Sequence, residues 1–277
     1  MVGKQSTSKS HPGAEFLSKK FDVTNKAILI TGASSGFGEH FAKMYAEAGC
    51  RVFALLARRT DRLEDLAADL RQSYPDINIA TVQCDVSKTE DIPRAFDEAE
   101  KKTGRCFDVI VNNAGIGPVV RVLNETEESY NMTMDVNTRA CFFVAQEAVK
   151  RLKAAEQRNG SIINISSIYG KRVGHGHAVY SISKAALTQM TKAMAIEVLG
   201  EGVRVNSVHP GFFRTELTQD YYDSPKGDAF LKKHVPMERL GLLEELDGVM
   251  LLLASDASSF MTGAELLVDG AHTTSSL

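Results

Sequence analysis

The sequence has no tryptophan, few cysteines, little net charge and no apolar run long enough to cross a membrane. The run Val249–Ala254 is much shorter than the roughly 18 residues that a spanning helix requires, and it predicts a core segment. The 277 residues carry a net charge of −3 and have an isoelectric point near 6.2. Nucleic-acid-binding domains usually show a basic footprint. The composition therefore gives no reason to expect a membrane or a nucleic acid as a partner.

The four cysteines stand at positions 50, 84, 106 and 141 and form no Cys-x-x-Cys pair. This spacing predicts buried thiols in a reducing compartment. Residues 1–24 are polar and lack the apolar segment of a secretory signal, so they predict a flexible tail on a cytoplasmic protein. Ser275–Leu277 loosely resembles the peroxisomal signal Ser-Lys-Leu but lacks its basic residue, which leaves a peroxisomal location as the weaker alternative.

From Lys26 onward, short apolar runs alternate with longer segments of helical spacing. The runs are rich in valine and isoleucine and mostly continuous, which is typical of parallel strands covered on both faces. Strands are predicted at residues 27–31, 52–57, 77–83, 107–112, 161–166, 203–208 and 265–268. Helices are predicted near 37–48, 60–73, 88–102, 125–156, 178–200 and 243–254. The alternation predicts a single α/β domain over residues 25–277, a Rossmann-type doubly wound parallel sheet of about seven strands. Ligands of such sheets bind at the carboxyl ends of the strands.

A glycine-rich turn, Thr31-Gly-Ala-Ser-Ser-Gly-Phe-Gly38, joins the first predicted strand to the first predicted helix. Its glycines let the backbone turn tightly and approach a pyrophosphate closely, and the helix behind them adds free amides and a positive dipole end. A merely flexible loop is the alternative, but the position between strand and helix favours dinucleotide binding. The predicted contacts in this turn are Gly32, Ser34, Ser35, Gly36, Phe37 and Gly38.

A hydroxyl, a phenol and an ammonium group stand together between Ser167 and Lys184. Tyr180 and Lys184 are four residues apart, so on a helix they share one face. A tyrosine alone is a poor base at neutral pH, but a nearby ammonium group favours the phenolate, and the pair can move a proton to or from a substrate oxygen. Ser167 offers a hydroxyl at the end of a predicted strand, and its neighbour Ser166 is the alternative for that position.

Two other kinds of site are disfavoured. His175 and His177 could suggest a metal, but two ligands in a glycine-rich loop, with no third nearby in sequence, make a poor metal site. We expect them to flank the substrate mouth or to face solvent, and we predict no metal. A serine hydrolase would need the motif Gly-x-Ser-x-Gly, whereas Gly32–Gly36 contains an extra residue.

Taken together, these motifs resemble the short-chain dehydrogenase/reductase family over about residues 25–271. The likeness rests on motifs in the family's order and intervals: Thr-Gly-x-x-x-Gly-x-Gly, Asp85, Asn112–Gly115, the Ser167, Tyr180 and Lys184 set, Pro210–Thr215 and Asp269-Gly270. The resemblance implies that Tyr180 is the catalytic acid/base and that Lys184 tunes it and bonds the nicotinamide ribose. It also implies that Ser167 steadies the substrate oxygen and that Asn137 holds a water in a proton relay.

The same resemblance implies a set of cofactor contacts beyond the glycine turn. Asp85 would bind the adenine, and Thr215 would hold the nicotinamide amide. The remaining implied contacts are Val86, Asn113, Ala114, Gly115, Pro210, Gly211 and Phe213, besides Tyr180 and Lys184. The family is commonly tetrameric through the helices that correspond to residues 125–156 and 178–200. Apolar residues on more than one face of these segments agree with a homotetramer.

The choice between NAD(H) and NADP(H) depends on the end of the second predicted strand. NAD binding is usually marked there by an acid that bonds the ribose 2′-OH, but no acid lies between residues 51 and 60. Arg58 and Arg59 follow instead, and guanidinium groups suit bidentate contact with a 2′-phosphate. The alternative is that they are solvated charges at a helix start. Counted from Gly49, the strand runs one residue longer than the family pattern, so either arginine could face the phosphate. NADP(H) is the preferred cofactor and NAD(H) the alternative.

The sequence thus predicts an NADP(H)-dependent oxidoreductase of the carbonyl reductase type, which interconverts a ketone and a secondary alcohol by hydride transfer. An NAD(H)-dependent sugar or polyol dehydrogenase, or a 3-oxoacyl-thioester reductase, is the alternative. A non-catalytic nucleotide-sensing scaffold is disfavoured because all four catalytic positions match. Residues 212–235 are rich in aromatics and predict a loop that closes over a small carbonyl or alcohol substrate. A surface excursion that packs its own aromatics is the alternative.

Overall fold

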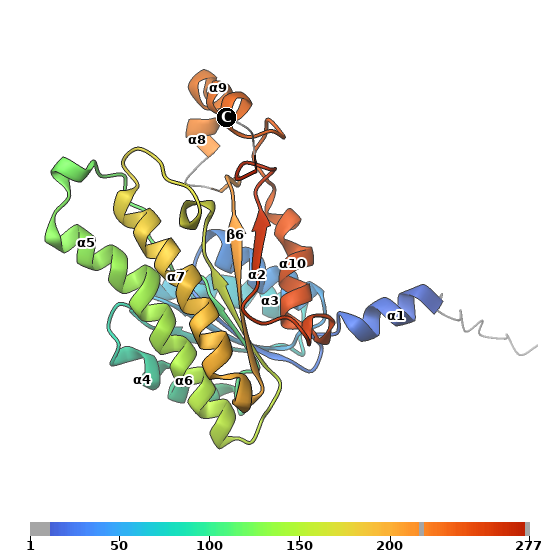
Figure 1. The fold of residues 1–277 in the computed structure, drawn as a ribbon. Coiled ribbons are helices and arrows are strands. Elements are labelled where there is room, and N and C mark those ends of the chain that lie inside the picture. Colours follow the sequence, from blue (N-terminus) through green and yellow to red (C-terminus); the bar gives the residue numbers. More distant parts are fainter. Residues whose placement is uncertain (1–11, 216–218, 275–277) are drawn as a thin grey trace, which may run out of the picture.

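The computed structural model describes residues 12–215 and 219–274. Its seven strands form one parallel sheet in the order β3-β2-β1-β4-β5-β6-β7 (Figure 1). The strands are β1 (Ala27–Thr31), β2 (Val52–Ala57), β3 (Asn78–Gln83), β4 (Val109–Asn112), β5 (Gly160–Ile165), β6 (Val203–Pro210) and β7 (Glu265–Val268). The chain winds outward from β1 to β3 and then starts again at β4, on the other side of β1. The predicted doubly wound fold is confirmed, and its switch point between β1 and β4 is where ligands of such sheets bind.

Helices connect the strands and cover both faces of the sheet (Figure 1). The α-helices are α1 (Pro12–Lys20), α2 (Gly36–Glu47), α3 (Thr60–Ser73), α4 (Asp91–Thr103), α5 (Glu127–Met134), α6 (Ala140–Ala154), α7 (Ala178–Glu197), α8 (Gln219–Tyr222), α9 (Pro225–His234) and α10 (Asp247–Ala254). A π-helical turn, η2 (Asp135–Arg139), joins α5 to α6. Short 3₁₀ helices are η1 (Val122–Asn124), η3 (Ile168–Gly170), η4 (Leu199–Glu201), η5 (Leu243–Leu246) and η6 (Asp256–Ser258).

The sheet separates two hydrophobic cores. Ile28 and Ile30 of β1 face the core made with α2, α3 and α10, whereas Ala27 and Leu29 face the core made with α4, α6 and α7. Side chains alternate between the faces of a strand, so a strand buried on both sides needs apolar residues throughout. All five residues of β1 are buried. The continuous apolar runs of the sequence are therefore explained by this double coverage.

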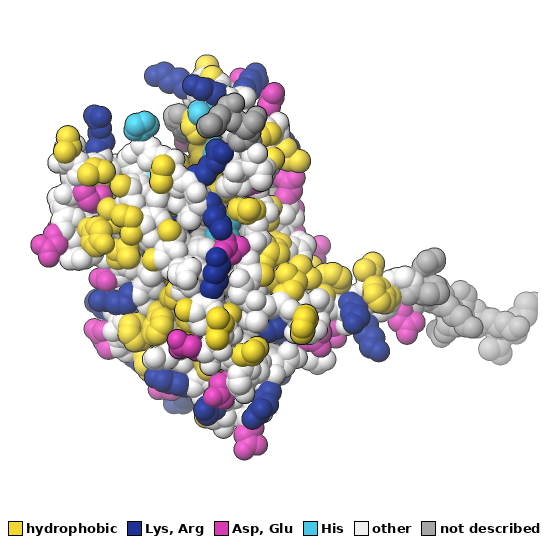
Figure 2. All heavy atoms as spheres, in the orientation of Figure 1, with side chains coloured by type: hydrophobic (Ala, Val, Ile, Leu, Met, Phe, Trp, Pro, Cys, Tyr) yellow, Lys and Arg dark blue, Asp and Glu magenta, His cyan; other side chains and the backbone are white. Residues whose placement is uncertain are grey.

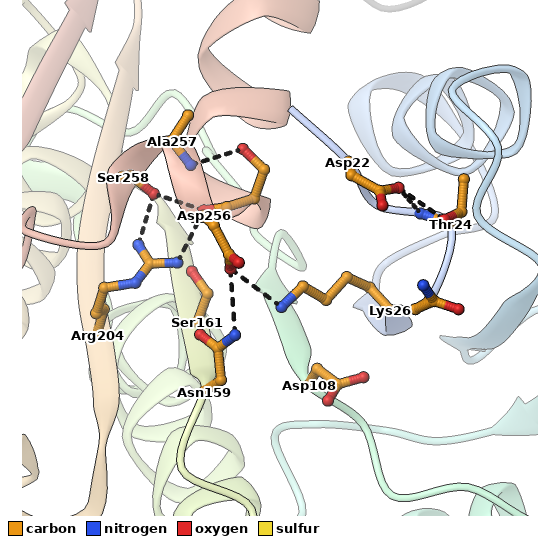
Figure 3. A network of polar contacts seen from close by, with 12 residues as sticks. Asp22, Thr24, Lys26, Asp108, Asn159, Ser161, Arg204, Asp256, Ala257 and Ser258 are labelled. Carbon is orange, nitrogen blue, oxygen red and sulfur yellow. Dashed lines mark hydrogen bonds and ion pairs between the residues drawn. The ribbon is translucent and has the colours of Figure 1, made fainter. Parts of the chain in front are cut away.

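Polar contacts fasten the amino ends of the strands to the loops beneath them (Figure 3). Asp256 of η6 accepts a hydrogen bond of 3.2 Å from Asn159, just before β5, and lies 3.6 Å from the ammonium group of Lys26, just before β1. Arg204, at the start of β6, donates to the hydroxyl of Ser258 over 2.7 Å. These bonds fix the edge of the sheet that is opposite to the glycine-rich turn. The carboxyl edge is left for binding.

Three segments differ from the sequence predictions. The predicted loop 212–235 contains the helices α8 and α9, so the prediction of a loop is wrong for those residues. Ser224 caps α9 by accepting from the N–H of Gly227, and Pro225 occupies its first turn, which explains why a helix starts at this place. The predicted helix 125–156 is interrupted by the π-helical turn. Helix α1 lies inside the segment predicted as a tail, where no helix was expected.

Two remaining sequence predictions concern compartments. The cysteines form no disulfide within the described residues: Cys50, Cys84 and Cys141 are buried and Cys106 is half-buried. Burial raises the pKa of these thiols, to about 12 for Cys50. Ser275–Leu277, with its peroxisome-like ending, lies outside the described residues. No helix among those that the structure describes is long and apolar enough to cross a membrane.

Candidate active site

The predicted catalytic residues come from three different segments and meet at the carboxyl edge of the sheet. Ser167 follows β5, Tyr180 and Lys184 lie in the first turns of α7, and Asn137 lies in the π-helical turn. The loop after β4 reaches the same place, because a Cβ atom on Gly115 would lie 3.4 Å from the Asn137 amide oxygen and 3.5 Å from the Lys184 ammonium nitrogen. The fold therefore brings together Gly115 and Lys184, which are 69 residues apart in the sequence.

Tyr180 and Lys184 share one face of α7, as predicted from their spacing. The Lys184 Nζ lies 5.8 Å from the centre of the Tyr180 ring and donates a 2.8 Å hydrogen bond to the carbonyl of Ile165, the last residue of β5. Lys184 is only 4% exposed, so its charge acts at short range within a poorly solvated site. Tyr180 is half-buried, and its hydroxyl makes no hydrogen bond with any group that the structure describes. The phenol is thus free to contact a bound molecule.

The two neighbouring serines at the end of β5 have different surroundings. The Ser166 hydroxyl bonds to the carbonyl of Lys184 and to the Thr188 hydroxyl, each over 3.2 Å, so it serves the packing of α7 on the sheet. The Ser167 hydroxyl instead accepts a 3.1 Å bond from the N–H of Tyr169 and donates to no group among the described residues. Ser167 therefore has a hydroxyl proton available, whereas Ser166 does not.

Asn137 is fully buried and holds the loop that follows β4. Its amide oxygen accepts from the N–H of Ile116, and its amide nitrogen donates to the carbonyl of Ile116, both over 2.8 Å. The nitrogen also donates to the hydroxyl of Ser183 over 3.0 Å. The π-helical turn carries this side chain toward the loop, in keeping with the frequent occurrence of such turns at functional sites. Asn137 thereby fixes the position of Gly115 over Lys184.

Aromatic rings continue from Tyr180 toward α9, and we call Tyr180, Tyr169, Phe212, Tyr222 and Phe230 the aromatic row. The ring centres of Tyr169 and Tyr180 are 5.8 Å apart, and those of Tyr169 and Phe212 are 6.4 Å apart. Phe212 in turn contacts Tyr222 and Phe230, at 5.5 and 5.4 Å. Burial, together with the nearby Tyr180, raises the pKa of Tyr169. The aromatics of residues 212–235 thus pack on one another and also reach the catalytic side.

The histidines of the loop before α7 differ in their environment. His177 packs on Tyr169 with 4.8 Å between ring centres, and burial lowers the pKa of its imidazole, so it is neutral at pH 7. His175 is exposed. No group of three or more His, Cys, Asp or Glu side chains among the described residues could hold a metal ion. His177 therefore belongs to the wall beside Tyr180.

The glycine-rich turn has open space next to its backbone at Gly36. Gly36 has a φ of +57°, and a Cβ atom there would meet nothing within 4 Å, so a side chain would project into open space above the turn. Ser35, the residue that precedes α2, makes no side-chain capping bond. The first amides of α2 are thus left for another acceptor, as in the phosphate sites of dinucleotide-binding proteins. These features fit a pyrophosphate.

The loop after β4 is fastened to this turn. The Asn113 side chain donates to the carbonyls of Thr31 and Gly32 over 2.9 and 3.1 Å. The Thr31 hydroxyl accepts from the N–H groups of Asn113 and Ala114, each over 3.1 Å. These bonds connect β1 to β4 across the switch point, so the glycine-rich turn is joined to the loop whose Gly115 lies close to Lys184. The Asn113 side chain therefore holds the loop after β4 against the glycine-rich turn.

Arg58 and Arg59 take different directions at the end of β2. Arg59 Nη2 lies 3.2 Å from the Ser34 hydroxyl and 3.0 Å from the Ser35 hydroxyl, so its guanidinium group lies over the glycine-rich turn. At Arg58 the backbone carbonyl accepts a hydrogen bond from the Gln83 side chain over 3.3 Å. Both side chains are exposed. Arg59 is therefore the arginine whose side chain contacts the glycine-rich turn.

The other predicted cofactor contacts lie along the same edge. Asp85 follows β3 and accepts from the hydroxyl of Ser87 over 2.8 Å, with Val86 buried beside it. Pro210 ends β6, and a Cβ atom on Gly211 would lie 2.8 Å from the Cα atom of Asp269. The rest of this loop comprises Phe213, whose ring meets that of Phe37 at 5.6 Å, and the half-buried Thr215.

Three neighbours of the site were not singled out from the sequence. Gly117 lies against Tyr180, because a Cβ atom on it would be 3.4 Å from the ring. Tyr169 contacts the Tyr180 ring, and His209 bonds the carbonyl of Ser167. Tyr169 could have been found by its position two residues after Ser167, and His209 by being a histidine within an otherwise apolar strand. For Gly117 the sequence carries no signal.

Comparison with known proteins decides the family. A family model described as enoyl-(acyl carrier protein) reductase matches residues 32–273, which is most of the chain. A solved short-chain type dehydrogenase/reductase from Mycobacterium marinum is 36% identical, with a TM-score of 0.85, over 94% of this chain and 99% of that chain. The chain belongs to the short-chain dehydrogenase/reductase family. The predicted resemblance is confirmed, and the protein is an oxidoreductase of this family.

Other short-chain dehydrogenases/reductases with known names act on different substrates. The 3-oxoacyl-[acyl-carrier-protein] reductase FabG of Rickettsia felis is 33% identical over 90% of this chain and 97% of its own length. A gluconate 5-dehydrogenase from Burkholderia cenocepacia, solved in complex with NADP and tartrate, has a TM-score of 0.86 and 31% identity, covering 93% of this chain and 99% of that chain. The family uses NAD(H) or NADP(H), and its members commonly form oligomers and act on small substrates.

Proposed function

We propose that this short-chain dehydrogenase/reductase is an NADP(H)-dependent carbonyl reductase that interconverts a ketone and a secondary alcohol. The observation that carries the proposal is the unpaired phenol of Tyr180, held between the buried ammonium group of Lys184 and the loop of Gly115 and Gly117. A proton donor with a cationic neighbour and an open side is what a reacting carbonyl oxygen requires. The available hydroxyl proton of Ser167 supplies a second hydrogen bond to that oxygen.

The bound nicotinamide would supply or accept the hydride. In the reductive direction, Tyr180 delivers its proton to the substrate oxygen as negative charge develops there, and Ser167 donates a hydrogen bond to the same oxygen. Lys184 stabilises the resulting phenolate through its positive charge. Its hydrogen bond to the Ile165 carbonyl keeps the ammonium group on the side of β5, where it meets Gly115. Asn137 keeps that loop in place and, as in the family, would hold the water of a proton relay to Lys184.

The residues fit a dinucleotide with a 2′-phosphate. The glycine-rich turn with its uncapped helix would hold the pyrophosphate, and the loop of Asn113–Gly115 would line the remainder. Arg59 supports NADP(H) because its guanidinium group already lies beside the hydroxyls of Ser34 and Ser35, which would offer a phosphate three donors at one place. The absence of an acid between residues 51 and 60 removes the usual partner of a free 2′-OH.

The aromatic row supports an apolar ketone or alcohol of medium size. Its members are aromatic side chains that bring no formal charge close to Tyr180, so they do not provide the charged partners that a sugar acid would require. A 3-oxoacyl thioester is the second candidate, favoured by the apolar character of the same wall and by the similarity to FabG of Rickettsia felis. Closure of α8 and α9 over the substrate would complete the wall, and residues 216–218 of the predicted loop lie outside the described residues.

A substitution of the phenol tests the function. Tyr180→Phe keeps the ring and removes the proton, so we expect turnover of NADPH with a ketone panel to fall by at least a hundredfold, in keeping with general acid catalysis. Binding of NADPH, followed by its fluorescence, should persist. Ser166→Ala serves as the matched control, because that hydroxyl only packs α7. Turnover by Tyr180→Phe close to the wild-type rate would refute the assignment.

Exposed apolar side chains support the assembly as a homotetramer. Figure 2 shows hydrophobic side chains on the face that carries α5, α6 and α7. The exposed apolar side chains of α5, α6 and α7 include Tyr130, Met132, Phe142, Phe143, Ile182 and Ile196, which are between 37 and 79% exposed. Large exposed apolar patches usually mark interfaces. Light scattering coupled to size exclusion should give a tetramer for the wild type and a smaller species for Phe142→Glu with Phe143→Glu. A monomeric wild type would contradict this assembly.

A further inference from the structure

A histidine that has no part in the proposed chemistry touches the backbone of Ser167. His209, in β6, is completely buried, and its Nδ1 atom lies 3.1 Å from the Ser167 carbonyl oxygen. Its Nε2 atom lies 2.9 Å from the hydroxyl of Ser207. Burying an imidazole is unfavourable unless both ring nitrogens find partners. Both are satisfied here, and one of the two partners is the residue that we place at the substrate oxygen.

The end of the sheet explains why a side chain is needed at this point. The last bond between β5 and β6 runs from the N–H of Ser166 to the carbonyl of Val208. In a parallel ladder the next bond would come from the N–H of residue 210, which is a proline and has none. The ladder therefore stops one residue before Ser167. The amide missing at Pro210 would have bonded the carbonyl of Ser166, and the His209 imidazole instead bonds the backbone one residue further on, at the carbonyl of Ser167.

The partners determine the tautomer of His209. A carbonyl oxygen can only accept, so Nδ1 carries the proton, and the neutral Nε2 accepts from the Ser207 hydroxyl. Burial lowers the pKa of His209, which agrees with a neutral ring. The charged groups that face it are Glu265, Lys171 and Lys184, and the first is itself paired with Lys171 and with Lys192. The imidazole is thus a fixed donor toward Ser167.

Ser167 is then held from both ends. Its carbonyl accepts from His209 and, over 2.9 Å, from the N–H of Gly170, which uses both lone pairs. Its hydroxyl accepts from the N–H of Tyr169. These three bonds fix the backbone and the side-chain torsion, and they leave the hydroxyl proton as the remaining donor. Catalytic hydrogen bonds lose much of their effect when the donor is misplaced by a fraction of an ångström, so the bond from His209 affects the chemistry.

We propose that His209 is a positioning residue that orients Ser167 through the Nδ1–H···O=C bond, in an arrangement that ends the β5–β6 ladder and aims the Ser167 hydroxyl at the substrate oxygen. The proposal rests on the function proposed above, because it assigns no contact between His209 and the substrate. It predicts that the effect of changing His209 is transmitted only through Ser167.

A double-mutant cycle tests this transmission. His209→Leu keeps the volume but removes the donor, and we expect kcat to fall roughly five- to tenfold with little change in KM or in NADPH affinity. His209→Asn places an amide N–H near the position of Nδ1 and should restore kcat to within about twofold of the wild type. In the Ser167→Ala background, His209→Leu should cost nothing further. Ser207→Ala, which removes the partner of Nε2, should show the same dependence on Ser167 with a smaller loss.

The controls separate positioning from general destabilisation. Ser161→Ala removes a buried 2.7 Å bond to the carbonyl of Leu253 at the opposite end of β5, so it should lower the melting temperature and leave kcat unchanged. Equal losses from His209→Leu with and without Ser167 would overturn the proposal, as would a failure of Asn to rescue. If Ser167→Ala alone kept full activity, the role of Ser167 itself would be refuted, and that of His209 with it. If His209→Leu does not fold, Ser207→Ala with and without Ser167→Ala completes the cycle, and equal losses in the two backgrounds would overturn the proposal.

Discussion

The position of Arg59 over the glycine-rich turn leads to a quantitative prediction for cofactor choice. Arg59→Ala removes a guanidinium group whose Nη2 lies 3.2 and 3.0 Å from the hydroxyls of Ser34 and Ser35. A hydrogen bond to a charged group contributes about 1.5–3 kcal/mol. Because Arg59 is exposed and solvent screens its charge, we take the lower half of that range. This corresponds to a loss of roughly 10- to 50-fold in kcat/KM for NADPH.

The assay measures both cofactors with one ketone, at low and at high salt. NADH has no 2′-phosphate, so its kcat/KM should change by less than about twofold, and the ratio between the cofactors should shift by nearly the whole effect. Added salt should weaken NADPH binding by the wild type more than by the variant. Arg58→Ala is the matched control, since the contact at Arg58 is made by its backbone carbonyl. Equal losses for the two cofactors, or a larger loss from Arg58→Ala, would refute the assignment of the phosphate to Arg59.

Two further predictions concern the glycine-rich turn and the pH dependence of stability. Gly38→Ala would place a methyl group against the Gly32 carbonyl and 2.6 Å from the Asn113 amide nitrogen. A fluorescence titration of this variant should therefore show at least a tenfold loss of NADPH affinity. The control is Gly200→Ala, whose added methyl group would meet nothing within 4 Å and should leave the NADPH affinity unchanged. Burial lowers the pKa of His209, so below about pH 6.5 the unfolded chain binds a proton that the folded protein excludes, and stability falls as the pH falls. His209→Asn should flatten this fall between about pH 7 and pH 5 in denaturant titrations, and an unchanged pH dependence would show that His209 does not titrate in this range.

The fold could be predicted because its main determinants are local. The predicted strands 27–31, 52–57 and 265–268 match β1, β2 and β7 residue for residue. Continuous apolar runs indicate strands covered on both faces, and this sheet is covered on both faces. The prediction was wrong where it relied on aromatic content instead of helix signals. Ser224 and Pro225 begin α9 and basic residues end it, so the sequence did contain the pattern of a helix there.

The geometry around Asn137 could not be predicted from the sequence. The spacing of residues 125–156 favours one regular helix, and nothing local distinguishes a π-helical turn from the helix on either side. The turn exists because the Asn137 side chain bonds both backbone groups of Ile116, 21 residues away, and the hydroxyl of Ser183, 46 residues away. Three hydrogen bonds made by this buried side chain outweigh the poorer bonding of a single π turn. Motif order indicated that Asn137 belonged to the site, and only tertiary contacts give its geometry.

The choice between Arg58 and Arg59 depends on which side of the extended chain each side chain faces. The presence of two arginines in the sequence could therefore suggest a phosphate site, but it could not say which arginine contacts the phosphate. Alternate residues of a strand face opposite sides, so a shift of one position exchanges the two arginines. β2 pairs with β1 from Val52 with Ala27 to Leu56 with Thr31, and the N–H of Ala33 bonds the carbonyl of Leu56. This register fixes where the chain leaves the sheet. Arg59 is thereby brought to the serines of the turn, and a sequence one residue shorter between Gly49 and Arg59 would bring a different side chain there.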